Sequence, residues 1–215
     1  MAVCLSPHCP DIALVQSASR SKLRKIMRER RRELPEQSRV EASHAITLQL
    51  TATHLFRNSK RIAFYYANDG EVETFALMRR AWDMCKRCYL PRLYRIRTRR
   101  LWFAPVHEGT KLTVNRFGIP EPDLSPRHMV AAGSLDIIVV PLVAFDAAGN
   151  RIGMGGGFYD STLAFLNQRR SWLRPRLVGV AYEFQKVGSL RPYPWDVPLD
   201  AIVTEERIYF PPRRV

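Results

Sequence analysis

Short apolar runs alternate with helix-length segments through most of this chain, and that alternation restricts its fold more than any other feature. The run IIVVP at residues 137–141 is almost purely β-branched, which is typical of a strand covered on both faces. Strands separated by helical segments indicate βαβ units. We therefore expect an α/β fold with three αβα layers, in which helices cover both faces of a largely parallel sheet. The expected strands are residues 61–67, 88–91, 101–106, 137–141, 177–182 and, as the last, 201–204.

Apolar residues spaced three and four apart indicate the helices. The first helix carries an apolar stripe beside an Arg-rich face, and the stripe consists of Leu23, Ile26, Met27, Arg30 and Leu34. Ser19 or Ser21 can cap this helix, and Pro35 ends it. Further helices are expected at residues 36–56, 74–85 and 158–166.

The 215 residues suit a single domain, which we place at residues 19–215 behind a variable N-terminal extension at residues 1–18. No apolar run approaches the roughly 18 residues that a membrane span needs. The N-terminus also lacks a basic stretch followed by an apolar one, the pattern of a secretory signal. We therefore expect a cytoplasmic protein that does not bind membranes, and we expect it to be a monomer.

The chain is strongly basic, with 34 Lys and Arg against 20 Asp and Glu, a formal net charge of +14. Such a charge favours polyanionic partners, which include nucleic acids, nucleotides and polyglutamylated cofactors. Three basic runs at residues 28–33, 92–100 and 169–176 support an alternative hypothesis of RNA or DNA binding, and aromatic residues are interleaved in the last two. No recognised nucleic-acid module accompanies them, so we do not expect nucleic acid as the partner.

Four cysteines are too few for a disulfide scaffold in a chain of this length. Cys85 and Cys88 form a CxxC motif where a helix is expected to run into a strand, the reverse of a redox motif. The second CxxC of a zinc site is missing. We expect ordinary buried or half-buried cysteines.

A glycine-rich loop, GNRIGMGGGFYD at residues 149–160, has five glycines within nine residues, between a buried strand and an expected helix. Glycine permits positive φ and close approach, so successive N–H groups can converge on a phosphate. The loop is neither a Walker A motif nor a GxGxxG fingerprint. Asp160, which follows an aromatic pair, is the type of ligand that Mg²⁺ prefers beside phosphates. The alternative is a plain surface turn.

Ligands of open α/β sheets bind beyond the carboxyl ends of the strands. Three segments follow buried strands of the expected sheet: NDGEVET at residues 68–74, the stretch 145–160 that contains the glycine-rich loop, and EFQKVGSLRPYPWD at residues 183–196. We expect these segments to meet and form the binding site.

The stretch VPLVAFDAAGNRIGMGGGFYD at residues 140–160 closely resembles the signature of the 5-formyltetrahydrofolate cyclo-ligase family, also called methenyltetrahydrofolate synthetases. Five further stretches resemble the family in the right order, and the resemblance runs from about Arg20 to the C-terminus. They are RSKLRKIMRERRREL (20–34), YYANDGEVET (65–74), RFGIPEP (116–122), VGVAYEFQKVGSL (178–190) and WDVPLDAIVTE (195–205).

The resemblance implies an enzyme that uses ATP and Mg²⁺ to convert 5-formyltetrahydrofolate, with or without a polyglutamate tail, into 5,10-methenyltetrahydrofolate. It also implies the release of ADP and phosphate through a phosphorylated formyl intermediate. A sugar-phosphate or coenzyme A enzyme on a similar fold is a further alternative, since a fold does not determine function.

The resemblance also implies roles for individual residues. Glu71 is the implied catalytic residue, holding the pterin or the N10 proton. The implied magnesium carboxylates are Asp160 and Asp196. The implied ATP-binding residues are Arg20, Ser21, Lys22, Leu23, Arg24, Arg151, Ile152, Gly153, Met154, Gly155, Gly156, Gly157, Phe158 and Tyr159. The implied folate-binding residues are Tyr66, Glu71, Met154, Gly155, Gly156, Gly157 and Phe158.

Three of these residues have a plainer interpretation: Tyr66 as a core aromatic, Asp196 as a turn residue, and Glu71 as a charge at a helix N-terminus. The sequence also departs from the commoner family pattern. Met154 and Gly156 stand where many members have Arg and Lys, so backbone N–H groups are expected to contribute more of the anion binding. Ser161 stands where an Arg often follows the magnesium-associated Asp.

Overall fold

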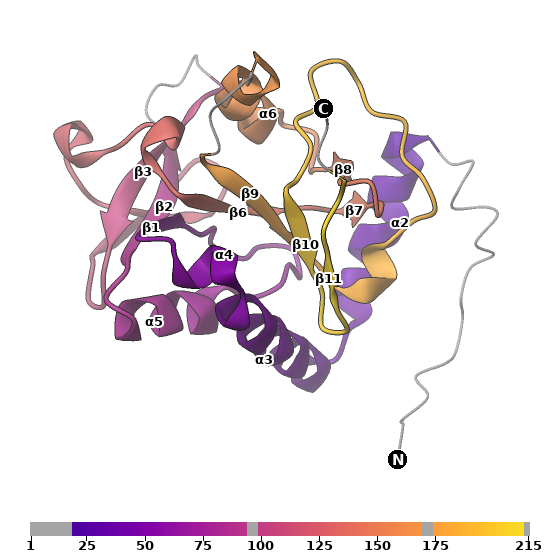
Figure 1. Ribbon diagram of the computed structural model, residues 1–215, viewed down its shortest axis with the longest axis horizontal. Helices are drawn as coiled ribbons and strands as arrows, with labels where there is room; N and C mark the ends of the chain where they lie inside the picture. Colours follow the sequence, from indigo (N-terminus) through magenta and orange to yellow (C-terminus); the bar gives the residue numbers. More distant parts are fainter. Residues whose placement is uncertain (1–18, 94–98, 169–173, 213–215) are drawn as a thin grey trace.

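The computed structural model describes residues 19–93, 99–168 and 174–212 (Figure 1). The expected extension at residues 1–18 lies outside the described residues, as do parts of the second and third basic runs. None of the helices in the described ranges is long and apolar enough to cross a membrane.

A seven-stranded sheet forms the centre of the molecule, in the order β11-β10-β9-β6-β1-β2-β3. The strands from β10 to β2 run parallel to one another, and the edge strands β3 and β11 are antiparallel to their neighbours. The sheet is therefore largely parallel, as predicted. Its strands are β1 (Arg61–Ala63), β2 (Arg87–Leu93), β3 (Leu101–Val106), β6 (Ile137–Pro141), β9 (Arg176–Val180), β10 (Ala201–Val203) and β11 (Ile208–Tyr209).

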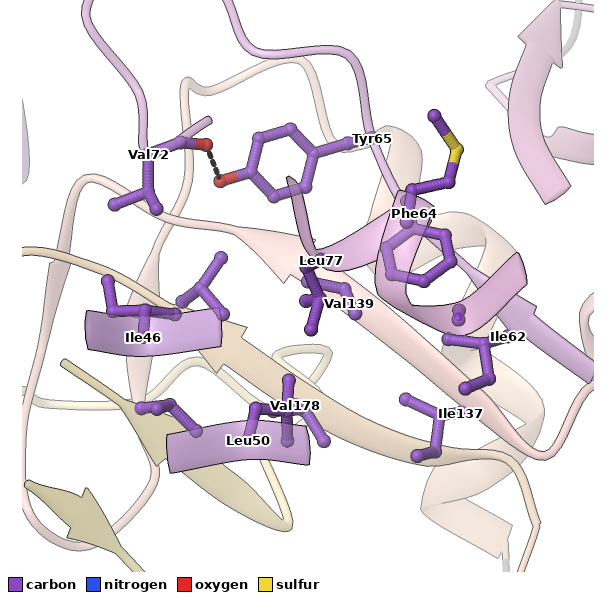
Figure 2. Packing of buried hydrophobic residues seen from close by; sticks show 14 of the residues in the cluster. Ile46, Leu50, Ile62, Phe64, Tyr65, Val72, Leu77, Ile137, Val139 and Val178 are labelled. Carbon is purple, nitrogen blue, oxygen red and sulfur yellow. Dashed lines mark hydrogen bonds between the residues drawn. The ribbon is translucent and has the colours of Figure 1, made fainter. Parts of the chain in front are cut away.

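Helices cover both faces of this sheet, which confirms the three-layer α/β fold. One face is covered by α3 (Glu36–Ala52), α4 (His54–Arg57) and α5 (Phe75–Asp83) (Figures 1 and 2). The other is covered by α6 (Phe158–Leu163) and the 3₁₀ helices η2 (Ala132–Ser134) and η3 (Ala164–Gln168). The helix α2 (Arg20–Glu33) packs against the turn after β6.

Strand β6 shows why its sequence is apolar throughout. Ile137 and Val139 face the layer of α3 and α5, whereas Ile138 and Val140 face the layer of α6. All four side chains are fully buried. Burying a side chain of this kind contributes about 1.5–3 kcal/mol, so the two-sided burial of this strand anchors both layers.

Several element bounds differ from the predicted ones. Strand β1 ends at Ala63 rather than at residue 67, and of the described residues just beyond it only the Phe64 N–H still donates to β2, at the Tyr89 carbonyl. The helix predicted at residues 36–56 breaks at Thr53, whose side chain accepts a hydrogen bond from the Phe56 N–H and caps α4. Ser19 caps α2, as one of the two predicted candidates. The helix predicted at 158–166 divides into α6 and η3.

Five short strands were not predicted. Strand β11 follows β10, so residues 201–204 do not contain the last strand. Two small antiparallel pairs also form outside the main sheet. They are β4 (Leu112–Val114) with β5 (Pro120–Pro122), and β7 (Ala144–Phe145) with β8 (Arg151–Ile152).

Candidate functional site

A cavity of about 600 Å³ opens beyond the carboxyl ends of β1, β2 and β6. Its wall contains residues from the segment after β1, from the glycine-rich loop and from residues 193–196, so the structure brings together the three segments expected to meet. Helix α2 and the β4–β5 hairpin complete the wall. The predicted residues that line it are Arg20, Arg24, Tyr66, Glu71, Arg151, Gly153, Met154, Gly155, Gly156, Gly157, Phe158, Tyr159, Asp160 and Asp196.

Four predicted ATP-binding residues do not line this cavity. Leu23 and Ile152 are buried in the apolar cluster under α2, since they lie on the core side of a helix and a short strand. Ser21 and Lys22 are exposed on the outer side of α2. The structure therefore places only Arg20 and Arg24 of this segment at the cavity, because a helix turns successive side chains to different faces.

Positive φ angles and a hydrogen bond from α2 fix the conformation of the glycine-rich loop. Gly155 and Gly157 have φ of 99° and 69°, in the left-handed region where residues with a Cβ are strained. Arg24 donates from Nε to the Gly153 carbonyl over 2.8 Å, and its guanidinium lies beside Gly155. The loop therefore presents backbone next to a fixed positive charge. Helix α6, which follows, has only six residues.

The two predicted magnesium carboxylates each bind an arginine. Asp160 accepts a 2.7 Å hydrogen bond from Arg151, whose side chain is only 4% exposed. Asp196 accepts a 2.5 Å bond from Arg20 and a 2.8 Å bond from the Tyr193 N–H. Burial lowers the pKa of Arg151, and the charges of both Asp160 and Asp196 oppose that change. Both carboxylates thus act on the same guanidinium in the cavity wall.

The donor set at this end fits magnesium bound together with phosphates. Within the described ranges, no group of three or more His, Cys, Asp or Glu side chains is arranged to hold a metal ion. Mg²⁺ commonly takes one or two carboxylates and completes its shell with water and substrate phosphates. Asp160 and Asp196 supply that number of carboxylates beside the glycine-rich loop.

Glu71 lies on the cavity wall, nearly buried. Its Oε2 accepts a 3.2 Å bond from the Asn68 N–H, and its Oε1 lies 3.8 Å from Arg31 Nη1. Burial raises the pKa of Glu71 from 4.5 to about 7, against the opposing effect of the Arg31 charge. The carboxyl group can therefore both hold and release a proton near neutral pH.

Arg31 and Asp69 were not predicted to matter. Arg31 is fully buried, and it donates to the Leu142 carbonyl over 3.3 Å and to Asp69 over 3.2 Å. Asp69 has φ of 53° and also binds Arg28 and Arg32, which lower its pKa against the effect of burial. A signal for Arg31 was present, since it lies four residues beyond the buried Met27 on the same face of α2.

Two pairs of aromatic side chains line the cavity. Phe117 and Phe158 meet edge to face at 5.7 Å between ring centroids, whereas Tyr193 and Trp195 stack at 4.9 Å. The buried hydroxyl of Tyr159 has no hydrogen-bond partner among the described residues, and burial raises its pKa.

The plainer interpretations of three residues can now be compared with their positions. Tyr66 is 44% exposed, so it is not a core aromatic. Glu71 lies before the helix α5, which begins at Phe75 behind its N-cap, and is not a charge of that helix end. Asp196 does belong to a turn, because its N–H donates to the Tyr193 carbonyl, and it lines the cavity as well.

Comparison with known proteins shows similarity along most of the chain. The model of the 5-formyltetrahydrofolate cyclo-ligase family matches residues 16–205. The 5-formyltetrahydrofolate cyclo-ligase of Escherichia coli (strain K12) is 37% identical over 185 residues, which cover 86% of this chain and 99% of that protein. The Haemophilus influenzae protein of the same name is 38% identical over 185 residues, covering 86% and 97%. The solved structure of Aquifex aeolicus 5,10-methenyltetrahydrofolate synthetase has a TM-score of 0.75 at 33% identity, covering 91% of this chain and 95% of that one.

Proposed function

The chain belongs to the 5-formyltetrahydrofolate cyclo-ligase family, and on that premise we propose that this enzyme uses ATP and Mg²⁺ to convert 5-formyltetrahydrofolate into 5,10-methenyltetrahydrofolate. One observation carries the proposal. The same cavity contains a glycine-rich loop with Arg24, two carboxylates suited to magnesium, and Glu71 with a pKa of about 7. Groups suited to a nucleoside triphosphate and a group suited to proton transfer on a folate therefore line one cavity.

The backbone of the glycine-rich loop and the guanidinium groups of Arg20 and Arg24 orient the phosphates of ATP and balance their charge. Asp160 and Asp196 would hold Mg²⁺, which neutralises charge that develops on the transferred phosphoryl group. Position and charge neutralisation are the main contributions that a protein makes to phosphoryl transfer. The loop lacks side-chain cations at Met154 and Gly156, so its N–H groups carry more of this role.

The formyl oxygen of the substrate is a poor leaving group, and phosphorylation activates it. The N5-formyl oxygen forms a bond to the γ-phosphorus, and the bond between that phosphorus and the β–γ bridging oxygen breaks, releasing ADP. N10 then bonds to the formyl carbon, and the carbon–oxygen bond to phosphate breaks. The proton on N10 must leave as the ring closes. Glu71 is suited to accept it, because a base with a pKa near the working pH transfers protons efficiently.

The test is the near-ultraviolet absorbance of 5-formyltetrahydrofolate incubated with the protein, Mg²⁺ and ATP. We expect the methenyl absorption band to grow only when both ATP and Mg²⁺ are present, with one ADP formed for each product molecule. Omitting ATP and omitting Mg²⁺ are the two controls. A protein that binds ATP but produces no methenyl band would show that the folate assignment is wrong.

The nucleic-acid hypothesis loses support from the first basic run. Arg28, Arg31 and Arg32 all bind the carboxylate of Asp69, at 2.6, 3.2 and 2.5 Å. Their charge is therefore partly balanced within the protein. Oligonucleotide binding that falls steeply with salt would restore the hypothesis. The sugar-phosphate and coenzyme A alternatives have no support in the family match. A monomeric state, a cytoplasmic location and a polyglutamate tail on the substrate remain predictions.

A further inference from the structure

The β4–β5 hairpin brings a buried carboxylate to the cavity wall that none of the roles above uses. Glu121, in the middle of β5, is only 7% exposed and lines the cavity. Its Oε1 accepts two hydrogen bonds, one from Asn115 Nδ2 over 2.7 Å and one from the Leu93 N–H over 3.1 Å. Two donors on different elements therefore hold this oxygen in place.

The second oxygen of Glu121 has a different environment. No hydrogen bond to Oε2 and no ion pair of this carboxylate occurs within residues 19–93, 99–168 and 174–212. A carboxylate taken out of water without full compensation costs free energy, so a buried one is expected to find donors. Because Oε1 is already occupied by protein donors, Oε2 is available to a ligand in the cavity.

The surroundings of Glu121 suit a flat ring. Leu93, Leu101, Phe117 and Phe158 line the same cavity, and the two phenylalanines are in edge-to-face contact. The guanidinium of Arg20 and the carboxylates of Asp160 and Asp196 belong to other elements of the wall, remote in sequence from this hairpin. An apolar wall with one oriented carboxylate favours an aromatic heterocycle that carries N–H donors along one edge.

We propose that Glu121 determines substrate specificity by accepting hydrogen bonds from the 2-amino and N3–H groups of the pteridine ring. The proposal rests on the proposed function and assigns a residue to the recognition of its substrate. A site built to hydrogen-bond a substrate group rejects analogues that lack the group, because its own buried polar atom is then left unpaired. Glu121 therefore selects pterins over heterocycles that lack these donors.

The test combines a changed residue with a changed substrate. Glu121→Gln keeps the shape of the side chain, and the donors of Asn115 and Leu93 hold its amide oxygen where Oε1 was. The amide NH₂ then faces the donors of the pteridine. We expect kcat/KM for 5-formyltetrahydrofolate to fall roughly 10- to 100-fold, the range for losing a hydrogen bond to a charged group, with the KM for ATP unchanged.

The second arm uses 2-desamino-2-methyl-5-formyltetrahydrofolate, which lacks the amino donor. The unchanged protein should use this analogue roughly 10- to 100-fold less well than the natural substrate. The Glu121→Gln variant should discriminate between the two less than threefold. Glu108→Gln, at an exposed glutamate in the turn before the same hairpin, is the matched control and should retain full discrimination.

Equal discrimination by the unchanged protein and by Glu121→Gln would overturn the inference while leaving the proposed function intact. Absence of turnover and of 5-formyltetrahydrofolate binding in the unchanged protein would overturn both. If Glu121→Gln does not fold, Glu121→Asp serves in its place, since it draws the carboxylate back by one methylene and should also weaken discrimination. Retention of full discrimination by a folded Glu121→Asp protein would equally count against the inference.

Discussion

The pKa of Glu71 predicts that this residue destabilises the fold at neutral and alkaline pH. Burial raises its pKa from 4.5 to about 7, so the folded protein holds a proton that the unfolded chain has released. A difference of this size, at about 1.4 kcal/mol for each pH unit, corresponds to roughly 3 kcal/mol. Glu71→Gln replaces the carboxylate with a neutral group of the same shape and removes this cost.

The pH range of this destabilisation follows from the raised pKa of Glu71 in the folded state. Below about pH 4.5 the carboxyl group is protonated in both the folded and the unfolded states, so the variant and the unchanged protein should be equally stable. Between about pH 4.5 and 7 the folded state binds more protons, so stability falls as the pH rises. Above about pH 7 the free energy of unfolding of Glu71→Gln should exceed that of the unchanged protein by the full difference of roughly 3 kcal/mol.

Urea unfolding at pH 4.5, 6 and 8 measures this difference directly. At pH 8 we expect the free energy of unfolding of Glu71→Gln to exceed that of the unchanged protein by roughly 3 kcal/mol. In thermal unfolding at the same pH this difference should raise the melting temperature by about 6–12 °C, while the ligase activity falls sharply. Glu29→Gln, at an exposed glutamate of α2, is the matched control and should show no pH-dependent difference. A stability difference that is the same at all three pH values would refute the reasoning, because it could not come from the titration of Glu71.

Three further predictions concern other residues. Asp160→Asn should reduce ATP-dependent turnover at limiting Mg²⁺, and unchanged turnover at every Mg²⁺ concentration would show that Asp160 does not hold the metal. The same change should destabilise the fold by about 1–3 kcal/mol, because it weakens the bond to buried Arg151. Arg31→Met should move the acidic limb of the pH profile of kcat/KM to higher pH, since the Arg31 charge lowers the pKa of Glu71. An unshifted limb would show that Arg31 does not influence the titration of Glu71. Gly179→Ala should cost about 1–3 kcal/mol in thermal unfolding with the KM values unchanged, because its Cβ would lie 2.6 and 2.7 Å from two buried leucine side chains; a variant of full stability would contradict this packing.

Much of the fold could be predicted because its signals are local. The apolar run at residues 137–141 became β6 with the predicted bounds, and residues 101–106 became β3. Both runs are apolar enough that only a buried strand suits them. The missed elements are short pairs such as β4–β5, whose strands have only three residues each and carry no apolar period. Their formation depends on the partner strand rather than on their own sequence.

The candidate site was predictable in part and for a similar reason. The glycines of residues 153–157 and the carboxylates Glu71 and Asp160 follow buried strands, and strand ends of a parallel sheet meet at one edge. Glu121 lies in a stretch that resembles the family, yet nothing in the sequence indicates that its side chain is buried. Leu23 and Ile152 were assigned to ATP by position in a motif, whereas the structure buries both in the core.

The sequence by itself determined the layers of this protein, the loop that can bind phosphate and the family to which the chain belongs. Tertiary structure alone decided which charges are paired and which carboxylates are buried. Arg31 reaches a carbonyl 111 residues away, and Arg20 reaches a carboxylate 176 residues away. A periodic pattern in the sequence predicts contacts only between residues a few positions apart, because it reflects the repeat of a single helix or strand. The pKa of Glu71 and the accessible oxygen of Glu121 depend instead on groups from distant elements, which meet only when the chain has folded.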